Sequence, residues 1–369
     1  MSGVFDRHPW ARWTLPGVAV AGLVAGGLFL PSTASADGLA PRTAEQLLAD
    51  VQQAQVPGLS GHVTETADLG LPSLPASMTG TDTSLTSLIT GTHTARVWTS
   101  GTGKSRIAIE AQGQETDVVR NGGTVWEWSS ANKSATRMLL PADTAKRPAT
   151  TRTPLTPQQA AQQIVQALGP STTITTAAND VVAQHAAYEL VLTPKDSSSR
   201  VASVQIAIDG KTKIPLRVEV FSTRMSAPAI SFGFDRVDFT APAASVFDFT
   251  PPAGATVTTK DLGTAAAKKP SATASGTTPQ KPTVIGTGWT QIATGHIDLA
   301  AMTKQPASGS TSSGTSISRL LGLLPTVTGS YGTAHVIDGT LVSVVITTDG
   351  RYAVGAVAPD KLLAALPAK

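Results

Sequence analysis

The segment Gly101-Thr102-Gly103-Lys104-Ser105 resembles the end of a phosphate-binding loop, in which glycine N–H groups beside a lysine hold a phosphate. The full G-x-x-x-x-G-K-[ST] pattern would place its first glycine at Trp98, and it requires a helix after the lysine. Arg106 to Glu110 instead alternates polar and apolar residues as a strand does. The segment therefore predicts a hairpin turn and not a nucleotide site.

Other residue types that do chemistry are dispersed along the chain. The histidines are His8, His62, His93, His185, His296 and His335. Their spacing matches neither a helical turn nor alternate strand positions, so it does not indicate a metal site. The chain has no cysteine, which excludes disulfides, thiolate metal sites, a cysteine nucleophile and lipidation of an N-terminal cysteine.

Hydrolytic chemistry has equally little support. No G-x-S-x-G nucleophile elbow is present. The carboxylate pairs Asp235/Asp238 and Glu115/Asp117 lie beside basic residues, which favours surface ion pairs over paired acid/base catalysis. We therefore expect a non-enzymatic protein with no cofactor and no metal.

Charge excludes a further class of partner. Charged residues make up 14% of the 369 residues, against roughly 25% in typical proteins. The formal net charge is +3, and the excess lies largely in one segment, Lys260 to Thr283, which holds Lys268, Lys269 and Lys281 as well. No basic patch with interleaved aromatic residues is present, so a nucleic-acid partner is not expected.

The N-terminal 36 residues predict export. Arg7 and Arg12 precede an apolar run from Thr14 to Leu30, and Ala34-Ser35-Ala36 has the small residues of a signal-peptidase site. Cleavage would leave Asp37 as the first residue. The alternative is an uncleaved anchor, because the run lies near the short end of the ~17–25 residues that span a bilayer. Either way the rest of the chain is expected outside the cytoplasm or in the cell envelope.

The chain is expected to fold as two units. Residues 260–283 are poor in large apolar side chains and predict a flexible linker between a unit at 37–259 and a unit at 284–369. The large unit opens with a helix capped by Thr43 and Gln46, and a second helix is signalled by Thr156-Pro157 and ended by Gly169. A weaker helical stretch covers Ser84 to Ile89. In the small unit, Asp338-Gly339 and Asp349-Gly350 predict two type I′ hairpins, with helices at Ile317 to Leu324 and after Pro359.

Most of the large unit alternates with period two, which predicts an antiparallel meander. The strands are expected at Arg106–Glu110, Thr116–Arg120, Thr124–Ser129, Tyr188–Leu192, Val201–Ile208, Leu216–Phe221 and Ile230–Phe239. One face is expected to be apolar and to form a ligand-binding wall of Ile107, Ile109, Trp126, Trp128, Leu190, Leu192, Val204, Ile206, Ile208, Leu216, Val218, Val220, Phe232 and Phe234. The other face is expected to be polar and solvated.

This apolar face is wide, while the predicted helices are short and few. Either the helices and loops close the core, or an apolar groove remains that suits an acyl chain. Trp126 and Trp128 are correspondingly either core residues or groove walls. The segment Leu69 to Pro75 is either a gate over the groove or an irregular connection.

Several stretches together resemble the LolA-like superfamily of lipoprotein carriers, which includes the sigma-E regulatory protein RseB. They are RTAEQLLADVQQAQVPGLSGHVTET, VVRNGGTVWEWSSANKSATRM, TPQQAAQQIV, AYELVLTPKDSSSRVASVQIAIDGKTKIPLRVEVF and FDRVDFTAPAASVFDFTPPAGATV. The resemblance covers residues 42–257, and TLVSVVITTDGRYAVGAV is similar to the C-terminal domain of RseB-like members. It implies an α+β fold, in which an unclosed antiparallel half-barrel capped by helices precedes a small α+β domain.

The resemblance implies a carrier for the acyl chains of a lipid or lipoprotein, with Trp126, Leu190, Ile206 and Val218 central in the groove. The alternative is an RseB-like envelope-stress regulator that binds a membrane anti-sigma factor. This chain departs from lipoprotein members because it lacks cysteine, and it shows no clear match to the arginine with which some carriers hold their cargo. A hydrolase is the third class, and the motifs above give it little support.

Overall fold

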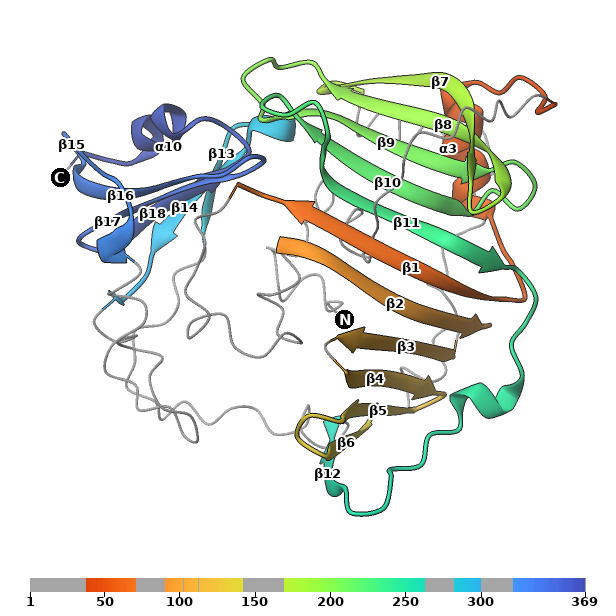
Figure 1. Ribbon diagram of the computed structural model, residues 1–369. Helices are drawn as coiled ribbons and strands as arrows, with labels where there is room; N and C mark the ends of the chain where they lie inside the picture. The colour runs from red at the N-terminus through yellow and green to blue at the C-terminus, as the bar shows by residue number, and fades with distance from the viewer. Residues whose placement is uncertain are drawn as a thin grey trace.

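The computed structural model describes residues 38–70, 90–101, 103–111, 113–141, 169–262, 282–299 and 321–368. These residues form a 12-stranded sheet and a 6-stranded sheet, shown in Figure 1. The expected N-terminal signal, the helices at 84–89 and 156–169, the segment beyond Gly70 and most of the linker lie outside the described residues. Within the described ranges, no helix has the length and apolar character needed to cross a bilayer.

The large sheet has the order β12-β6-β5-β4-β3-β2-β1-β11-β10-β9-β8-β7. Its strands are β1 Gly58–Asp68, β2 Thr90–Ser100, β3 Lys104–Ala111, β4 Gln114–Asn121, β5 Thr124–Ser129, β6 Ser134–Leu139, β7 Thr172–Val182, β8 His185–Pro194, β9 Val201–Asp209, β10 Pro215–Ser222, β11 Pro228–Asp238 and β12 Thr256–Asp261. Neighbours are antiparallel except β12, which runs parallel to β6. The two end strands, β12 and β7, do not pair with each other, so the sheet is an unclosed half-barrel, as expected.

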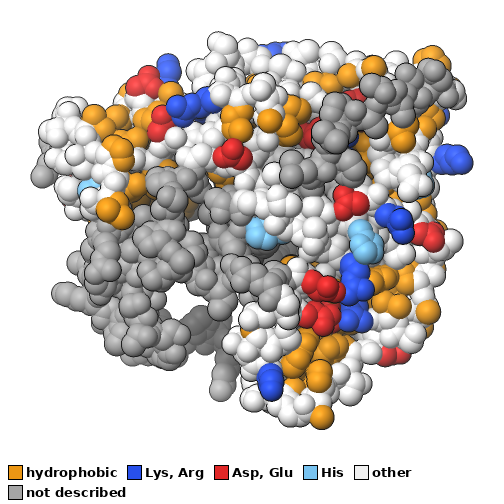
Figure 2. All heavy atoms as spheres, viewed as in Figure 1, with side chains coloured by type: hydrophobic (Ala, Val, Ile, Leu, Met, Phe, Trp, Pro, Cys, Tyr) orange, Lys and Arg blue, Asp and Glu red, His pale blue; other side chains and the backbone are white. Residues whose placement is uncertain are grey.

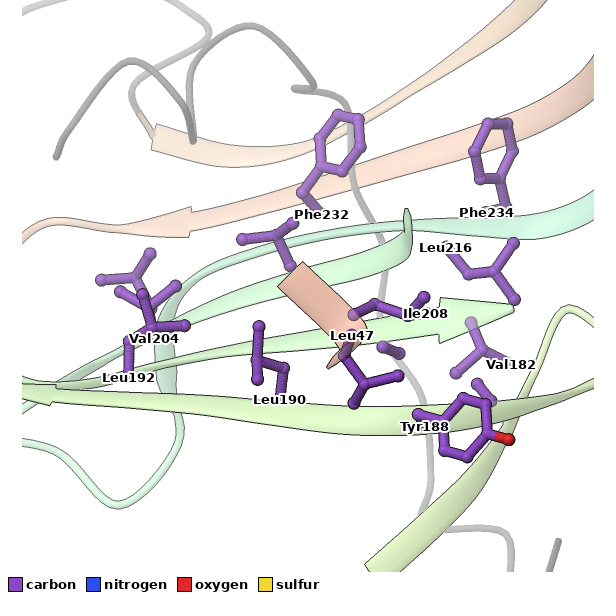
Figure 3. Packing of buried hydrophobic residues seen from close by; sticks show 14 of the residues in the cluster. Leu47, Val182, Tyr188, Leu190, Leu192, Val204, Ile208, Leu216, Phe232 and Phe234 are labelled. Carbon is purple, nitrogen blue, oxygen red and sulfur yellow. The ribbon is translucent and has the colours of Figure 1, made fainter. Parts of the chain in front are cut away.

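Helix α3 (Ala44–Gln53) begins at the predicted capping box. Gln46 N–H donates to Thr43 Oγ1 at 3.3 Å, and Thr43 N–H donates to Gln46 Oε1 at 3.0 Å. The helix places Leu47, which is fully buried, against the apolar face of β8, β9 and β10. Figure 3 shows Leu47 among Leu190, Ile208 and Tyr188. We call the buried cluster around Leu47 the α3 core.

A second core lies on the opposite face of the sheet, over β3–β6. After β11 the chain forms the short 3-10 helix η3 (Ala244–Phe247), which contacts β3 and β4, and then pairs as β12 with the edge strand β6. Phe247 is 1% exposed. The Phe249 ring centroid lies 5.6 Å from that of Trp126 and 6.5 Å from that of Trp128. The chain therefore covers the two halves of the sheet from opposite sides.

The small sheet has the order β13-β14-β18-β17-β16-β15. Its elements are β13 Thr283–Ile285, η4 Gly288–Thr290, β14 Ile292–His296, β15 Thr326–Gly329, β16 Gly332–Asp338, β17 Ser343–Thr347, β18 Arg351–Gly355 and the helix α10 Pro359–Ala365. Helix α10 starts at the predicted proline and buries Leu362 against Val345 and Ala353. Together these elements form the expected small α+β unit.

The structure confirms the two predicted hairpins, β16–β17 and β17–β18, but neither has the predicted type I′ turn. At β17–β18 the Gly350 N–H donates to the carbonyl of Thr347, so the central turn residues are Thr348 and Asp349, and Gly350, with φ 92°, follows them. Residues 339–342 instead form a longer connection that reaches the large sheet. Thr340 N–H donates to the Leu69 carbonyl at 2.7 Å, and Ser222 Oγ donates to the Thr340 carbonyl at 2.7 Å. The physical reason is that this loop is held by tertiary partners and not by a local turn.

Charged and apolar contacts extend this junction between the sheets. Asp338 forms ion pairs with Arg200 and with Arg224, the second at 3.1 Å. Leu341 is buried in the α3 core. Arg200 N–H donates to the Ala356 carbonyl at 2.7 Å. The small sheet is thus docked beside the end of β1.

Candidate ligand-binding face

Most of the predicted wall residues lie in the α3 core. Cross-strand partners share a face, and Leu190, Ile206, Val218 and Phe232 follow one another across β8–β11 in register. We call this side of the sheet the apolar face. The wall residues buried on it are Leu190, Leu192, Val204, Ile208, Leu216, Val218, Val220, Phe232 and Phe234, and Ile206 is half-buried beside them. In this half of the sheet α3 therefore closes the core, and the contact of these residues with a ligand stays a prediction.

The same face is open where it continues across β2–β6. Ile107 is 43% exposed and Val118, its Cα partner on β4, is 39% exposed. Val97 on β2 is the Cα partner of Ile107 on its other side. Ile109, Val125 and Met138 are half-buried on the same face, where the charged residues Glu127 and Arg120 are the Cα partners of Val118 and Val125. We call the six apolar residues Val97, Ile107, Ile109, Val118, Val125 and Met138 the open strip.

The prediction that Trp126 and Trp128 share a face with Ile107 is wrong. Ile107 pairs with Val118, and Val118 pairs with Glu127, so the tryptophans on either side of Glu127 point to the opposite face. There they pack on Phe249 under the chain that follows β11. An alternating strand shows which residues share a face but not which face is inward, and the tryptophans of β5 lie on the side opposite to the isoleucines of β3.

Glu65 lies on β1 where the α3 core meets the open strip. Its Cα partners are Phe232 on β11 and His93 on β2. The residue is 3% exposed, and its Oε2 has no hydrogen-bond partner within the described part of the chain. Burial raises the pKa of the Glu65 carboxyl above its usual 4.5, and the nearby His93 opposes this rise.

The opposite face is polar outside the second core. Arg217 on β10 contacts Asp180 at 2.9 Å and Glu219 at 3.3 Å. Arg106 pairs with Asp117 between β3 and β4. In the view of Figure 2, acidic and basic side chains are interleaved over the middle of the large sheet. This face matches the expected wet side and offers no apolar surface comparable to the open strip among the described residues.

Two hollows in the described structure have mixed or polar linings. One of about 500 Å³ lies at the β2–β3 and β4–β5 turns and is lined by Gly101, Lys104, Gly122 and Pro242 among others. The other, of about 230 Å³, is bordered by His62, Arg96, Glu110 and Asp235. Lys104 starts strand β3 and not a helix, so the hairpin-turn prediction for Gly101 to Ser105 is confirmed. The residues that the structure describes contain no group of three potential metal ligands.

Comparison with known proteins gives similarity at the level of structure only. No protein-family model matches the chain, and no curated protein sequence matches it. Similar solved structures are MucB and LolA-superfamily proteins. The complex of Pseudomonas aeruginosa MucA and MucB has a TM-score of 0.43 and 16% identity, over 88% of this chain and 98% of that chain.

Two further similar structures match a smaller share of the chain. A LolA-superfamily protein from Nitrosomonas europaea has a TM-score of 0.23 and 12% identity, over 57% of this chain and 99% of that chain. An uncharacterized conserved protein from Thermus thermophilus has a TM-score of 0.34 and 11% identity, over 59% of this chain and 99% of that chain.

Sequence reasoning misses most of the open strip and Glu65. Strands β1, β2 and β6 are absent from the prediction, because Gly, Ser, Thr and His interrupt their apolar alternation. Val118 and Val125 lie in predicted strands. The prediction puts the tryptophans inward and so leaves Val125 on the wrong side, and it assigns no face to Val118. The sequence of β1 does contain a signal for a carboxylate on the apolar face, because the acidic residue Glu65 alternates with Val63 and Ala67.

Proposed function

We propose that this protein is an exported, non-enzymatic carrier that holds the acyl chains of a lipid or lipoprotein against the open strip. The observation that carries this proposal is the division of the apolar face into a half closed by α3 and a half with exposed Ile107 and Val118. Exposed apolar surface that adjoins a core is stabilised when hydrocarbon covers it, by roughly 25 cal/mol per Å². The resemblance of the sequence to LolA-like carriers supports the same function.

The mechanism is exchange without bond formation. An acyl chain lying along the strip replaces water over Val97, Ile107 and Val118, and each buried CH₂ contributes about 0.8 kcal/mol. The acyl chain needs an apolar surface of matching shape that excludes water, and it needs no polar protein group along its length. Release to an acceptor then requires only a second apolar surface of comparable area.

Native mass spectrometry of the gently purified mature protein tests this function. We expect co-purifying species of lipid mass, and we expect Ile107→Asp to lower their occupancy at least about tenfold, because the substitution places a charge under the hydrocarbon. The matched control is Val327→Asp, since Val327 is 40% exposed on β15, the edge strand of the small sheet.

A far-UV circular dichroism spectrum like that of the wild-type protein in both variants shows that any loss of lipid occupancy is a local effect and not the result of unfolding. Absence of lipid on the wild-type protein, together with failure of added dodecyl ligands to bind, contradicts the carrier function. Equal loading of Ile107→Asp and Val327→Asp also contradicts it.

An RseB-like regulator is the second candidate. MucB, one of the similar structures, has been solved in complex with MucA(peri). In the present protein, the Thr340 loop of the small unit contacts Leu69 at the end of β1, the strand that borders the open strip. This contact would couple loading of the strip to a partner on the small unit. Recovery from cell envelopes of a membrane anti-sigma factor whose binding depends on lipid loading favours this candidate, and loading-independent recovery argues against it.

Export completes the proposal. The apolar run from Thr14 to Leu30 and the Ala34-Ser35-Ala36 site support delivery of residues 37–369 to the outside of the cytoplasmic membrane. N-terminal sequencing of protein recovered from the cell envelope tests it. A mature chain that starts at Asp37 supports cleavage, while a chain that keeps residues 1–36 and sediments with membranes supports an uncleaved anchor.

A further inference from the structure

The position of Glu65 is unusual for a carboxylate in this sheet. Strand β1 lies between β11, which belongs to the α3 core, and β2, which carries part of the open strip. Its residues Val63, Glu65 and Ala67 point to the apolar face, so Glu65 stands in a row of apolar side chains. It is nevertheless 3% exposed.

Several carboxylates on the opposite face have basic partners, whereas Glu65 has no arginine or lysine partner among the described residues. Asp117 pairs with Arg106 and Glu219 pairs with Arg217. The residues directly across from Glu65 are Phe232 and His93, and no ion pair with arginine or lysine joins Glu65 to any other described residue. Its Oε2 is buried without a hydrogen-bond donor in the described structure. A buried acceptor of this kind is costly unless a ligand supplies the donor.

We propose that Glu65 is the polar anchor of the carrier and selects acyl ligands whose head bears a hydrogen-bond donor, an ammonium or a hydroxyl group. This inference rests on the proposed acyl-binding function. When the acyl chain of the ligand lies on the open strip, the polar head group lies at β1. There Glu65 Oε2 accepts a hydrogen bond from the head group. Among described residues, His93 is the titratable group directly opposite, and it moderates the negative charge of the carboxylate.

The same geometry discriminates against anionic heads. A carboxylate or phosphate beside Glu65 would place two negative charges together in a site that water does not reach, and both would lack donors. An ammonium head instead forms a charge-assisted hydrogen bond, the strongest kind available to a carboxylate. A hydroxyl head is intermediate, because it donates a hydrogen bond but brings no charge.

Three ligands of equal chain length test the selectivity: dodecylammonium, dodecanol and dodecanoate, each below its aggregation concentration. Binding to the full mature chain is measured by isothermal titration at neutral pH. We expect the wild-type protein to bind dodecylammonium at least about tenfold more tightly than dodecanoate, which corresponds to about 1.4 kcal/mol. Glu65→Gln should reduce this ratio to within about threefold, since the amide has the same shape but no charge.

The matched control is Glu110→Gln. Glu110 is exposed on β3 and lies on the opposite face of the sheet, so its removal changes net charge equally without removing a buried acceptor. The control should keep the wild-type ratio. Glu65→Asp provides a second variant that keeps the charge, and it should keep the preference for dodecylammonium even if the shorter side chain weakens binding.

The outcomes separate this inference from the proposed function. Binding of all three ligands with a ratio that Glu65→Gln leaves unchanged overturns the role of Glu65 and leaves the carrier function standing. Equal loss of the ratio in Glu110→Gln also overturns it, because the preference then reflects net charge. Binding of none of the three ligands by the wild-type protein overturns both.

Discussion

Glu189 makes the stability of the large sheet depend on pH. It lies on β8 on the opposite face, is 6% exposed, and has neither carboxylate oxygen hydrogen-bonded within the described structure. Arg217 Nη2 lies 3.6 Å from Glu189 Oε2 but also contacts Asp180 and Glu219. Burial raises the pKa of Glu189 from 4.5 to about 7; Arg217 opposes this rise, and the carboxylates of Glu219 and Asp180 add to it.

The sign follows from comparing the folded and unfolded states. In the folded protein the carboxyl keeps its proton up to about pH 7, whereas in the unfolded chain it releases the proton near pH 4.5. Stability is therefore highest below pH 4.5 and falls as the pH rises from 4.5 to 7, after which this group contributes no further change. At about 1.4 kcal/mol for each pH unit, the interval corresponds to a loss of about 3 kcal/mol.

The substitution Glu189→Gln removes the charge while keeping the shape. We expect it to raise the free energy of unfolding by as much as about 3 kcal/mol at about pH 8 and to leave it nearly unchanged at about pH 4. Urea denaturation followed by far-UV circular dichroism measures both values, since the large sheet dominates that signal. The control is Glu127→Gln, which removes an exposed carboxylate from β5. A Glu189→Gln protein that is no more stable than wild type at the higher pH, or whose gain is the same at the lower pH, refutes the reasoning.

Three further substitutions test the packing. Phe247→Ala should lower the free energy of unfolding by about 3–5 kcal/mol in a urea titration, because it empties the second core; a loss below about 1 kcal/mol would show that this core is unimportant. Thr43→Ala should cost about 1 kcal/mol by removing the cap of α3, whereas Thr43→Ser should retain it; equal stability of the two variants would contradict the role of the cap. Asp338→Asn removes the negative charge that pairs with both Arg200 and Arg224, so hydrogen exchange at the Thr340 amide should accelerate while exchange in β17 is unchanged; equal acceleration at both sites would indicate general destabilisation instead of undocking.

The sequence by itself determined the local structure where the signals are local. The capping box at Thr43 and Gln46, the turn at Asp349-Gly350 and the strands β3, β4, β5 and β8–β11 depend on residues close together in the chain, so their patterns predict them. The alternation in β8–β11 likewise identified the residues of the α3 core, because one face of these strands is uniformly apolar.

Only the tertiary structure decided on which face of the sheet the apolar residues of each strand lie and what covers them. Trp126 and Trp128 point away from Ile107 because the chain after β11 crosses the opposite face and brings Phe247 and Phe249 onto β3–β6. The loop at Thr340 is shaped by Leu69 and Ser222, which are distant in the sequence. Glu65 becomes a buried acceptor only when β11 and β2 lie on either side of β1. Side-chain alternation fixes a strand's two sides, whereas the burial of each side depends on segments that the local sequence does not specify.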